Sequence, residues 1–225
     1  MASYVISDIH GCYRTFKKLC KDKLDLGSDD KLFVLGDHID HGPKSRQVLD
    51  YFKVLEDRVD NLILLRGNHE QRLLRAYYGT SDEDKAKWLN SGGKRALKSF
   101  GVASVEEVPE EYIDMIDDMP YFHEHGDYMM VHAGFDFTSH KPYSQYAEML
   151  EIRNWEYDKE IANGRTILHG HTPTRIKDIF RNVKADASVI CLDNGCCKEG
   201  NGIGCLVALE LESGKLYKQK CLDGS

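Results

Sequence analysis

The chain has 225 residues, of which 41% are hydrophobic and 30% are charged, and its formal net charge at pH 7 is −7. A chain of this length can bury about 70% of the surface that its unfolded state exposes, so it needs no disulfide staples. The acidic balance and the lack of a long basic run argue against a dedicated nucleic-acid binder.

The sequence shows no targeting segment and no membrane-spanning segment. The start, Met1-Ala2-Ser3 followed by a short apolar run, has neither a basic flank nor the core of a signal peptide. No apolar run approaches the ~20 residues that span a bilayer. The seven cysteines are an odd number without a secretory signal, so we expect free thiols in a reducing cytoplasm. We therefore predict a cytoplasmic protein without a membrane partner.

The first 65 residues follow a β-α-β-α-β pattern. Three short apolar runs predict strands at 4–7, 32–35 and 61–65. The segments between them, 13–23 and 44–58, carry apolar residues at helical spacing. This order predicts parallel strands that are joined by right-handed crossovers.

Residues 71–119 read as a series of short, charged, amphipathic helices. The predicted helices lie at 71–78, 84–89, 93–100 and 108–119. Because no linker-like stretch bounds them, we interpret them as a helical cap inserted into a single domain of residues 1–225.

From residue 121 onwards the pattern becomes mainly β. Strands are predicted at 121–124 and 128–131, which form a hairpin, and at 166–168 and 189–192. A helix is predicted near 143–151, and a second hairpin joins 204–212 to 215–221. We expect largely antiparallel strands in this half and an α/β (α+β) fold overall.

Potential metal ligands directly follow five of the predicted strands. In open α/β sheets the carboxyl ends of the strands form the ligand site. Mixed carboxylate, amide and imidazole donors suit Mn, Fe or Zn, and a shared carboxylate suits two metals side by side. We assign one metal to Asp8, His10 and Asp37, and the second to Asp37, Asn68, His132 and His171.

Five motifs occur in a fixed order: DIHG, GDHIDHG, RGNHE, VHAG and HGHTP. In this order they resemble the calcineurin-like metallophosphoesterases, especially the branch of serine/threonine protein phosphatases and symmetrical diadenosine tetraphosphate hydrolases. The chain length is similar to that of small bacterial and phage protein phosphatases. The resemblance implies two packed mixed β-sheets flanked by helices, and two divalent metal ions. Mn²⁺ is the expected ion in vitro, with Fe or Zn as alternatives.

The resemblance also implies a mechanism and roles for further residues. A metal-bridging hydroxide would attack the phosphorus in line. His69 would protonate the leaving oxygen while Asp40 holds its ring. Arg66 and Arg153 are the candidate phosphate clamps, because a guanidinium group matches phosphoryl oxygens with a planar fork of donors.

One position departs from the family pattern. Where this branch reads GD-x-x-D-R-G, with an arginine that contacts phosphate, the chain has His41. His41 could face the phosphate itself, or it could pack away while Arg46 serves instead. The change weakens the assignment of the substrate more than the assignment of the reaction.

Several functions stay open at the level of the sequence. The leading hypothesis is a phosphomonoesterase acting on phosphoprotein, and the second is hydrolysis of a dinucleoside polyphosphate or another small phosphorylated metabolite. The intact ligand set disfavours a non-catalytic scaffold, and the lack of a basic stripe disfavours a nuclease. The late cysteines lack paired C-x-x-C spacing, so they do not favour a structural zinc site. The oligomeric state is not indicated.

Overall fold

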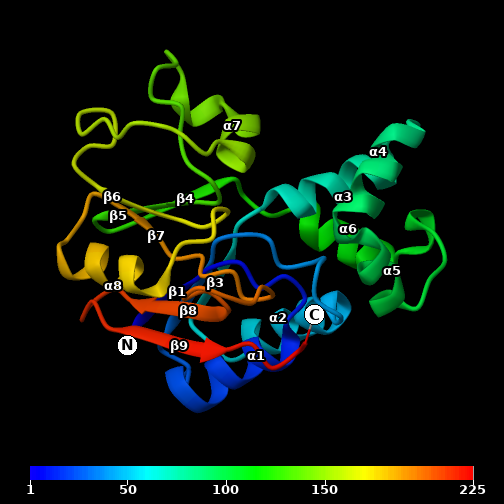
Figure 1. Ribbon diagram of the computed structural model, residues 1–225, viewed down its shortest axis with the longest axis horizontal. Helices are drawn as coiled ribbons and strands as arrows, with labels where there is room; N and C mark the ends of the chain where they lie inside the picture. Colours follow the sequence, from blue (N-terminus) through cyan, green and yellow to red (C-terminus); the bar gives the residue numbers. More distant parts are fainter. Residues whose placement is uncertain (225) are drawn as a thin grey trace.

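The computed structural model describes residues 1–224, which form two β-sheets with helices around them (Figure 1). The five-stranded sheet has the order β3 (Asn61–Leu64), β2 (Lys31–Val34), β1 (Ser3–Ile6), β8 (Cys205–Glu210) and β9 (Leu216–Lys220). The four-stranded sheet has the order β4 (Phe122–His125), β5 (Tyr128–Val131), β6 (Thr166–His169) and β7 (Val189–Cys191).

Both sheets are mixed. Strands β1, β2 and β3 are parallel, as predicted, whereas β8 pairs antiparallel with both β1 and β9. In the second sheet β4 and β5 form the predicted hairpin. The expectation of largely antiparallel strands in this half is wrong for β5, β6 and β7, which run parallel.

For β6 and β7, the error arises from a helix that the sequence analysis missed. Helix α8 (Ile176–Lys184) connects β6 to β7, and a crossover of this kind returns the chain in the same direction. Its apolar side chains Ile176, Ile179 and Val183 pack against the sheets. The spacing of these three residues in the sequence could have indicated the helix. The pattern is weak, because charged residues surround Ile179, the one fully buried residue of the helix.

The two sheets pack face to face over an apolar layer. Val5 and Phe33 of the first sheet lie in one cluster with Met130, Leu168 and Ile190 of the second. The alternate residues of β1 and β2 point to the other face, because side chains in a strand alternate between faces. That face is covered by α1 (Tyr13–Leu19), its π-helical extension (Cys20–Leu24) and α2 (Ser45–Glu56). The predicted class, two mixed sheets flanked by helices, is confirmed.

Helices occupy the connection between β3 and β4. They are α3 (Asn68–Tyr78), α4 (Asp82–Trp88), α5 (Lys94–Phe100) and α6 (Glu110–Asp117), with short helical turns at Leu89–Gly93 and Val105–Glu107. Figure 1 shows them gathered beside the sheets. Their buried side chains, such as Trp88, Phe100 and Ile113, belong to the same core as α1 and α2. These helices therefore share a core with α1 and α2, and their assignment as an insertion within a single domain stays a prediction.

The connection from β5 to β6 contains a 3-10 turn (Pro142–Ser144) and α7 (Tyr146–Glu151). Within residues 1–224, no helix combines the length and the apolar character that crossing a membrane requires.

Candidate active site

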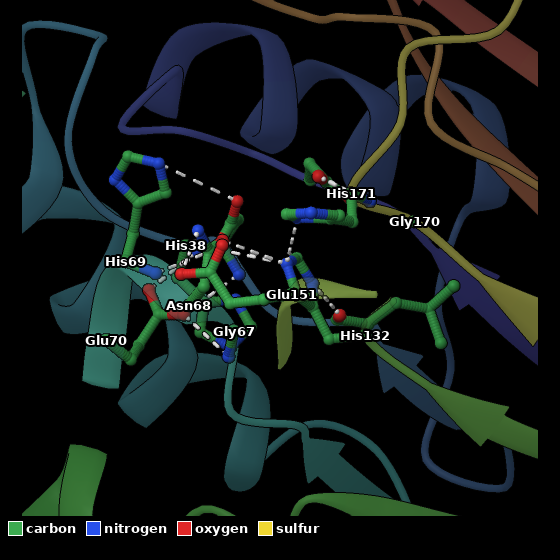
Figure 2. Close-up of polar contacts among 12 residues, drawn as sticks. His38, Gly67, Asn68, His69, Glu70, His132, Glu151, Gly170 and His171 are labelled. Carbon is green, nitrogen blue, oxygen red and sulfur yellow. Dashed lines mark hydrogen bonds and ion pairs between the residues drawn. The ribbon is translucent and has the colours of Figure 1, made fainter. Parts of the chain in front are cut away.

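Side chains from the ends of β1, β2, β3, β5 and β6 meet in one buried cluster, part of which is drawn in Figure 2. The six residues predicted to hold metal are each at most 8% exposed. The ligating atoms of Asp8, His10 and Asp37 lie within 4.8 Å of one another, and so do those of Asp37, His132 and His171. The structure thus brings together both predicted sets.

The Asp37 carboxylate lies between the two sets. Its Oδ2 lies 3.6 Å from His10 Nε2, and its Oδ1 lies 3.4 Å from His132 Nε2. The same His132 Nε2 lies 3.2 Å from His171 Nδ1 (Figure 2). One carboxylate therefore offers a separate oxygen to each set, which is one of the ways in which a carboxylate bridges two metals.

The histidine rings turn lone pairs towards Asp37. His132 Nδ1 lies 2.8 Å from the carbonyl oxygen of Leu35, and His10 Nδ1 lies 3.2 Å from that of Ile39. A carbonyl oxygen only accepts, so each Nδ1 carries a proton, and in the neutral tautomer that results the lone pair is on Nε2. Burial lowers the pKa of His10 to about 3, which keeps this ring neutral at pH 7. Lone pairs facing carboxylate oxygens fit a cation between them.

The amide of Asn68 lies between Asp37 and Arg72. One end is 3.1 and 3.2 Å from the two Asp37 oxygens and 3.2 Å from His132 Nε2, while the other end is 2.8 Å from Arg72 Nη2. With its oxygen towards Asp37, three acceptors face one another, which suits a bound cation. With its nitrogen there, the amide donates to Asp37 and accepts from Arg72. We expect metal binding to select the first orientation.

Asp8 is the second buried carboxylate of the cluster. Its oxygens accept hydrogen bonds from Ser7 Oγ at 2.7 Å and from the His171 backbone at 3.0 Å. Gly170 makes this approach possible, because a Cβ at that position would lie 2.0 Å from Asp8 Oδ1. Burial, and then the charge of Asp37, raise the pKa of Asp8 to about 8. Bound cations would relieve this penalty, so the donor chemistry fits divalent metal.

Glu70 holds the loop that carries Asp37. Its fully buried carboxylate accepts hydrogen bonds from the backbone nitrogens of Asp37 (2.9 Å), His38 (2.8 Å), Ile39 (3.2 Å) and Gly67 (2.9 Å). The sequence analysis gave Glu70 no role. The signal was the Gly-x-x-Glu spacing at the start of α3, where a glutamate reaches back to cap the first turn.

Backbone strain is concentrated in this cluster. Five non-glycine residues of the site adopt positive φ angles: His10 (49°), Asp37 (49°), Asp40 (68°), His41 (49°) and His171 (66°). Each such conformation costs of the order of 1–3 kcal/mol and is typical of functional sites. The Glu70 contacts supply part of the restraint that holds the Asp37 loop in this form.

His69 and Asp40 form a buried pair beside the cluster. His69 Nδ1 lies 2.8 Å from Asp40 Oδ2, and His69 Nε2 lies 4.0 Å from Asp37 Oδ2. Burial opposes protonation of His69, but the charge of Asp37 and the hydrogen bond to Asp40 outweigh it and raise its pKa to about 9. Burial raises the pKa of Asp40 to about 6. At pH 7 the metal-free pair is therefore an imidazolium with a carboxylate.

The sequence model of the calcineurin-like phosphoesterases matches residues 1–197. The chain belongs to this family. It is 32% identical over 140 residues to a symmetrical bis(5'-nucleosyl)-tetraphosphatase of Nitrosospira multiformis, a match that covers 60% of this chain and 44% of the relative. A protein of the same name from Buchnera aphidicola subsp. Schizaphis graminum is 36% identical over 90 residues, covering 40% of this chain and 32% of the relative. The chain thus spans less than half the length of these relatives.

Solved structures share the fold at low sequence identity. One described as a candidate diadenosine tetraphosphatase has a TM-score of 0.68 and 18% identity, covering 99% of this chain and 95% of that one. A protein serine/threonine phosphatase from Saccharomyces cerevisiae has a TM-score of 0.66 and 13% identity, covering 100% and 81%. These likenesses confirm the two-sheet arrangement.

In this phosphoesterase chain, Arg66 is turned towards the helical insertion. Its guanidinium donates to Gln71 Oε1 at 3.0 Å, Tyr121 Oη at 3.1 Å and Asp117 Oδ1 at 3.0 Å. The structure does not bring it to the metal cluster. Protein groups already engage the guanidinium in this position, and the role of Arg66 as a phosphate clamp stays a prediction.

Arg153 and Arg72 lie on the side of the cluster that contains His171. The exposed Arg153 donates to Thr172 Oγ1 at 3.2 Å, and its charge helps, after burial, to lower the pKa of His171 to about 3. Arg72 lies 2.7 Å from Glu151, and the sequence analysis missed it. Arg72 lies four residues after Asn68 on α3, and residues at this spacing share a helix face. This spacing could have indicated that Arg72 lies near the site.

His41 lies on the opposite side of the cluster. Its ring centre is 4.7 Å from that of His10 and 4.8 Å from that of His69, so it does not pack away from the site. Burial lowers its pKa to about 4, which leaves it neutral at pH 7. Arg46, the alternative considered from the sequence, contacts Tyr112 and Asp50 instead.

Three cysteines meet next to the site. The sulfur atoms of Cys12, Cys196 and Cys221 lie within 4.8 Å of one another, and those of Cys12 and Cys221 are 3.9 Å apart. All seven cysteines are free thiols, as predicted. The sequence spacing gave no sign of this cluster, because three distant segments form it.

Proposed function

We propose that this protein is a divalent-metal-dependent phosphoric ester hydrolase whose substrate is a small polyphosphate, such as a dinucleoside polyphosphate. The observation that carries the reaction class is the division of Asp37, one oxygen towards His10 and the other towards His132. The names of the relatives support the substrate class, because they hydrolyse bis-nucleosyl tetraphosphates. The sequence left two substrate classes open. This evidence favours a dinucleoside polyphosphate or another small phosphorylated metabolite over a phosphoprotein.

The residues divide between metal binding and proton transfer. Asp8, His10 and Asp37 would hold one ion, and Asp37, Asn68, His132 and His171 the other. Bound there, two divalent ions would supply Lewis acidity and activate a water near neutral pH. Oxygen and imidazole donors suit Mn²⁺, Fe or Zn²⁺.

His69 is the proposed general acid. Asp40 accepts from Nδ1, so Nε2 is the ring atom that faces the centre and can release a proton. A water that has released one proton to solvent bonds through its oxygen to phosphorus, and the bond to the leaving oxygen breaks with its electron pair. His69 Nε2 protonates that oxygen and regains a proton from solvent. Asp40 orients the ring and favours its charged form.

The phosphate being transferred needs cationic contacts as well. Arg153 and Arg72 flank the His171 side of the cluster and are the proposed clamps. Arg72 would have to exchange part of its ion pair with Glu151 for the substrate. His41, neutral beside His69, would contribute a hydrogen bond but no fixed charge.

A substrate panel tests this proposal. The purified protein with Mn²⁺ should hydrolyse an aryl phosphate and diadenosine tetraphosphate, and kcat/KM should be higher for the tetraphosphate than for a phosphoserine peptide. Asp37→Asn, which weakens the shared ligand, is the negative control. No hydrolysis of any phosphate ester would overturn the reaction class, and a preference for the phosphopeptide would overturn the substrate class.

A further inference from the structure

A cationic pocket opens beside His41. Its volume is about 410 Å³, and Lys94, Arg95 and Lys198 line it together with His41. Within residues 1–224, no acidic residue belongs to its lining. The three cations come from α5 and from the loop that follows Asp193, about a hundred residues away in sequence. The pocket therefore carries a positive charge that nothing in its walls neutralises.

The helical insertion fixes this pocket against the site. At Gly92 the backbone has a φ angle of 121°, and a Cβ there would lie 2.8 Å from the Cβ of Asp40. Arg95 Nη1 donates to the carbonyl oxygen of His41 at 2.5 Å. These contacts place the cations beside the loop that carries Asp40 and His41.

A second pocket on the other side of the cluster lacks this character. Its volume is about 330 Å³, and its lining includes the cations Arg72, Arg75 and Lys87 but also Glu148 and Glu151. Arg72 already pairs with Glu151 at 2.7 Å. An added anion would gain less there, because the charges of this pocket are partly balanced.

The position of His69 tells which part of a substrate would enter the cationic pocket. The general acid must stand beside the leaving oxygen. The His41 ring, whose centre is 4.8 Å from that of His69, forms part of the pocket wall. The pocket therefore lies on the leaving-group side of the reacting phosphorus. This step rests on the proposed role of His69.

We propose that Lys94, Arg95 and Lys198 form a subsite for the phosphate groups of the leaving group. The substrate class is then a phosphoanhydride with an anionic leaving group, such as a nucleoside or dinucleoside polyphosphate. Ammonium and guanidinium groups pair well with phosphate oxygens, whereas the neutral side chain that leaves from a phosphoprotein offers them nothing. The family pattern has an arginine at the position of His41. The subsite supplies positive charge next to His41, in place of that arginine.

The reaction that this subsite serves adds one water across a P–O–P linkage. The water oxygen bonds to the reacting phosphorus, and the bridging oxygen leaves on the other phosphate with the electron pair of the broken bond. The new charge falls on the group that the three cations hold. Proton donation by His69 then matters less than for an alkoxide, because a phosphate is a better leaving group.

Single substitutions test the subsite by comparing two substrates. Lys94→Ala, Arg95→Ala and Lys198→Ala each remove one cation, and Lys177→Ala on α8 removes an exposed cation outside the pocket. We expect KM for diadenosine tetraphosphate to rise at least tenfold more than KM for an aryl phosphate in the pocket variants. Lys177→Ala should change neither KM. Calorimetric titration with inorganic tripolyphosphate should show at least tenfold weaker binding to Lys198→Ala than to the unchanged protein.

The outcomes separate the subsite from the function on which it rests. Equal changes of both KM values, or none, with unchanged tripolyphosphate binding would overturn the subsite while the esterase assignment stands. A metal-loaded protein that hydrolyses neither substrate would overturn the proposed function itself. Tripolyphosphate binding that depends on Lys198 would then still support an anion subsite at this place.

Discussion

The two oxygens of Asp37 face different imidazoles, and this division allows the end of one strand to serve two sets of ligands. Backbone carbonyls fix the rings of His10 and His132 so that Nε2 points inward. Two histidines outside the ligand sets also have defined positions. Asp40 holds the ring of His69, and the ring of His41 packs against that of His69.

Replacing His69 by Asn should separate acid catalysis from metal binding. The variant loses the proton donor but none of the proposed ligands. We expect kcat to fall by about 10²–10⁴ for a phosphate ester with a poor leaving group, and by much less for a good one. Elemental analysis should find unchanged metal content. Loss of a metal ion from the variant would make His69 a ligand instead.

Replacing Asp40 by Asn should change the pH dependence of the reaction. The acid form of His69 is active, so the rate should fall as pH rises through the pKa of His69. The charges of Asp37 and Asp40 raise that pKa to about 9 in the metal-free protein, and cations on Asp37 will lower it. Without the Asp40 charge the pKa falls further. The alkaline limb of kcat against pH should therefore move to lower pH, and an unmoved limb would refute the pairing.

Replacing His41 by Arg should restore a permanent charge beside the leaving group. Burial lowers the pKa of His41 to about 4, so the native side chain is neutral over the working pH range. A guanidinium there should lower KM for a small phosphate ester. The decrease should correspond to about 1–2 kcal/mol of added charge-assisted hydrogen bonding. The KM of both proteins is to be measured from pH 6 to 9. Coincident values would remove His41 from the substrate site.

The site also depends on how whole elements meet. Helix α3 starts directly at the third strand-end motif, so Asn68, His69 and Glu70 occupy its first turn. Glu70 ties this turn to the loop after β2 through backbone hydrogen bonds. Helix α5, further along the chain, brings two of the pocket's three cations, Lys94 and Arg95, to His41.

Replacing Glu70 by Gln should loosen the loop that follows β2. The amide keeps the shape but places donors against backbone N–H groups, leaving buried donors unsatisfied. The free energy of unfolding of the variant, measured after a chelator has removed bound metal, should be lower by about 1–3 kcal/mol. Urea unfolding is the measurement, and the exposed Glu56→Gln on α2 is the control, expected within about 0.5 kcal/mol of the unchanged protein. Equal stability of both variants would show that the contacts do not hold the loop.

Local signals predicted the strands and the residues that meet at their ends, and contacts between distant segments account for what was missed. Short apolar runs that end in Asp8, Asp37 and Asn68 mark parallel strand ends, and parallel strand ends share one edge. The direction of the Arg66 side chain depends on Tyr121 and Asp117, which no local pattern connects to it. The cationic pocket and the cysteine cluster likewise combine segments far apart in sequence. The parallel pairing of β6 with β7 was missed because helix α8, which connects them, was missed.

At the scale of the whole molecule, two mixed sheets place five strand ends around one buried cluster. Helices α1 and α2 cover the outer face of the first sheet, and the connection from β5 to β6 packs on the second. Helix α5 and the loop at Lys198 add a cationic wall on one side of the cluster. The fold is shared with phosphatases of different specificity, so the fold alone does not choose the substrate. The central claim is therefore the chemistry of the cluster.

The most direct test measures bound metal and hydrolysis in the same samples. The protein is stripped with a chelator, then titrated with Mn²⁺ while bound ions and aryl phosphate hydrolysis are followed. We predict that the stripped protein is inactive, that activity returns as the second ion per chain binds, and that Asn in place of Asp37 weakens the binding of both ions. Full activity of the stripped protein, or saturation of activity with no ion bound at these residues, would contradict the account.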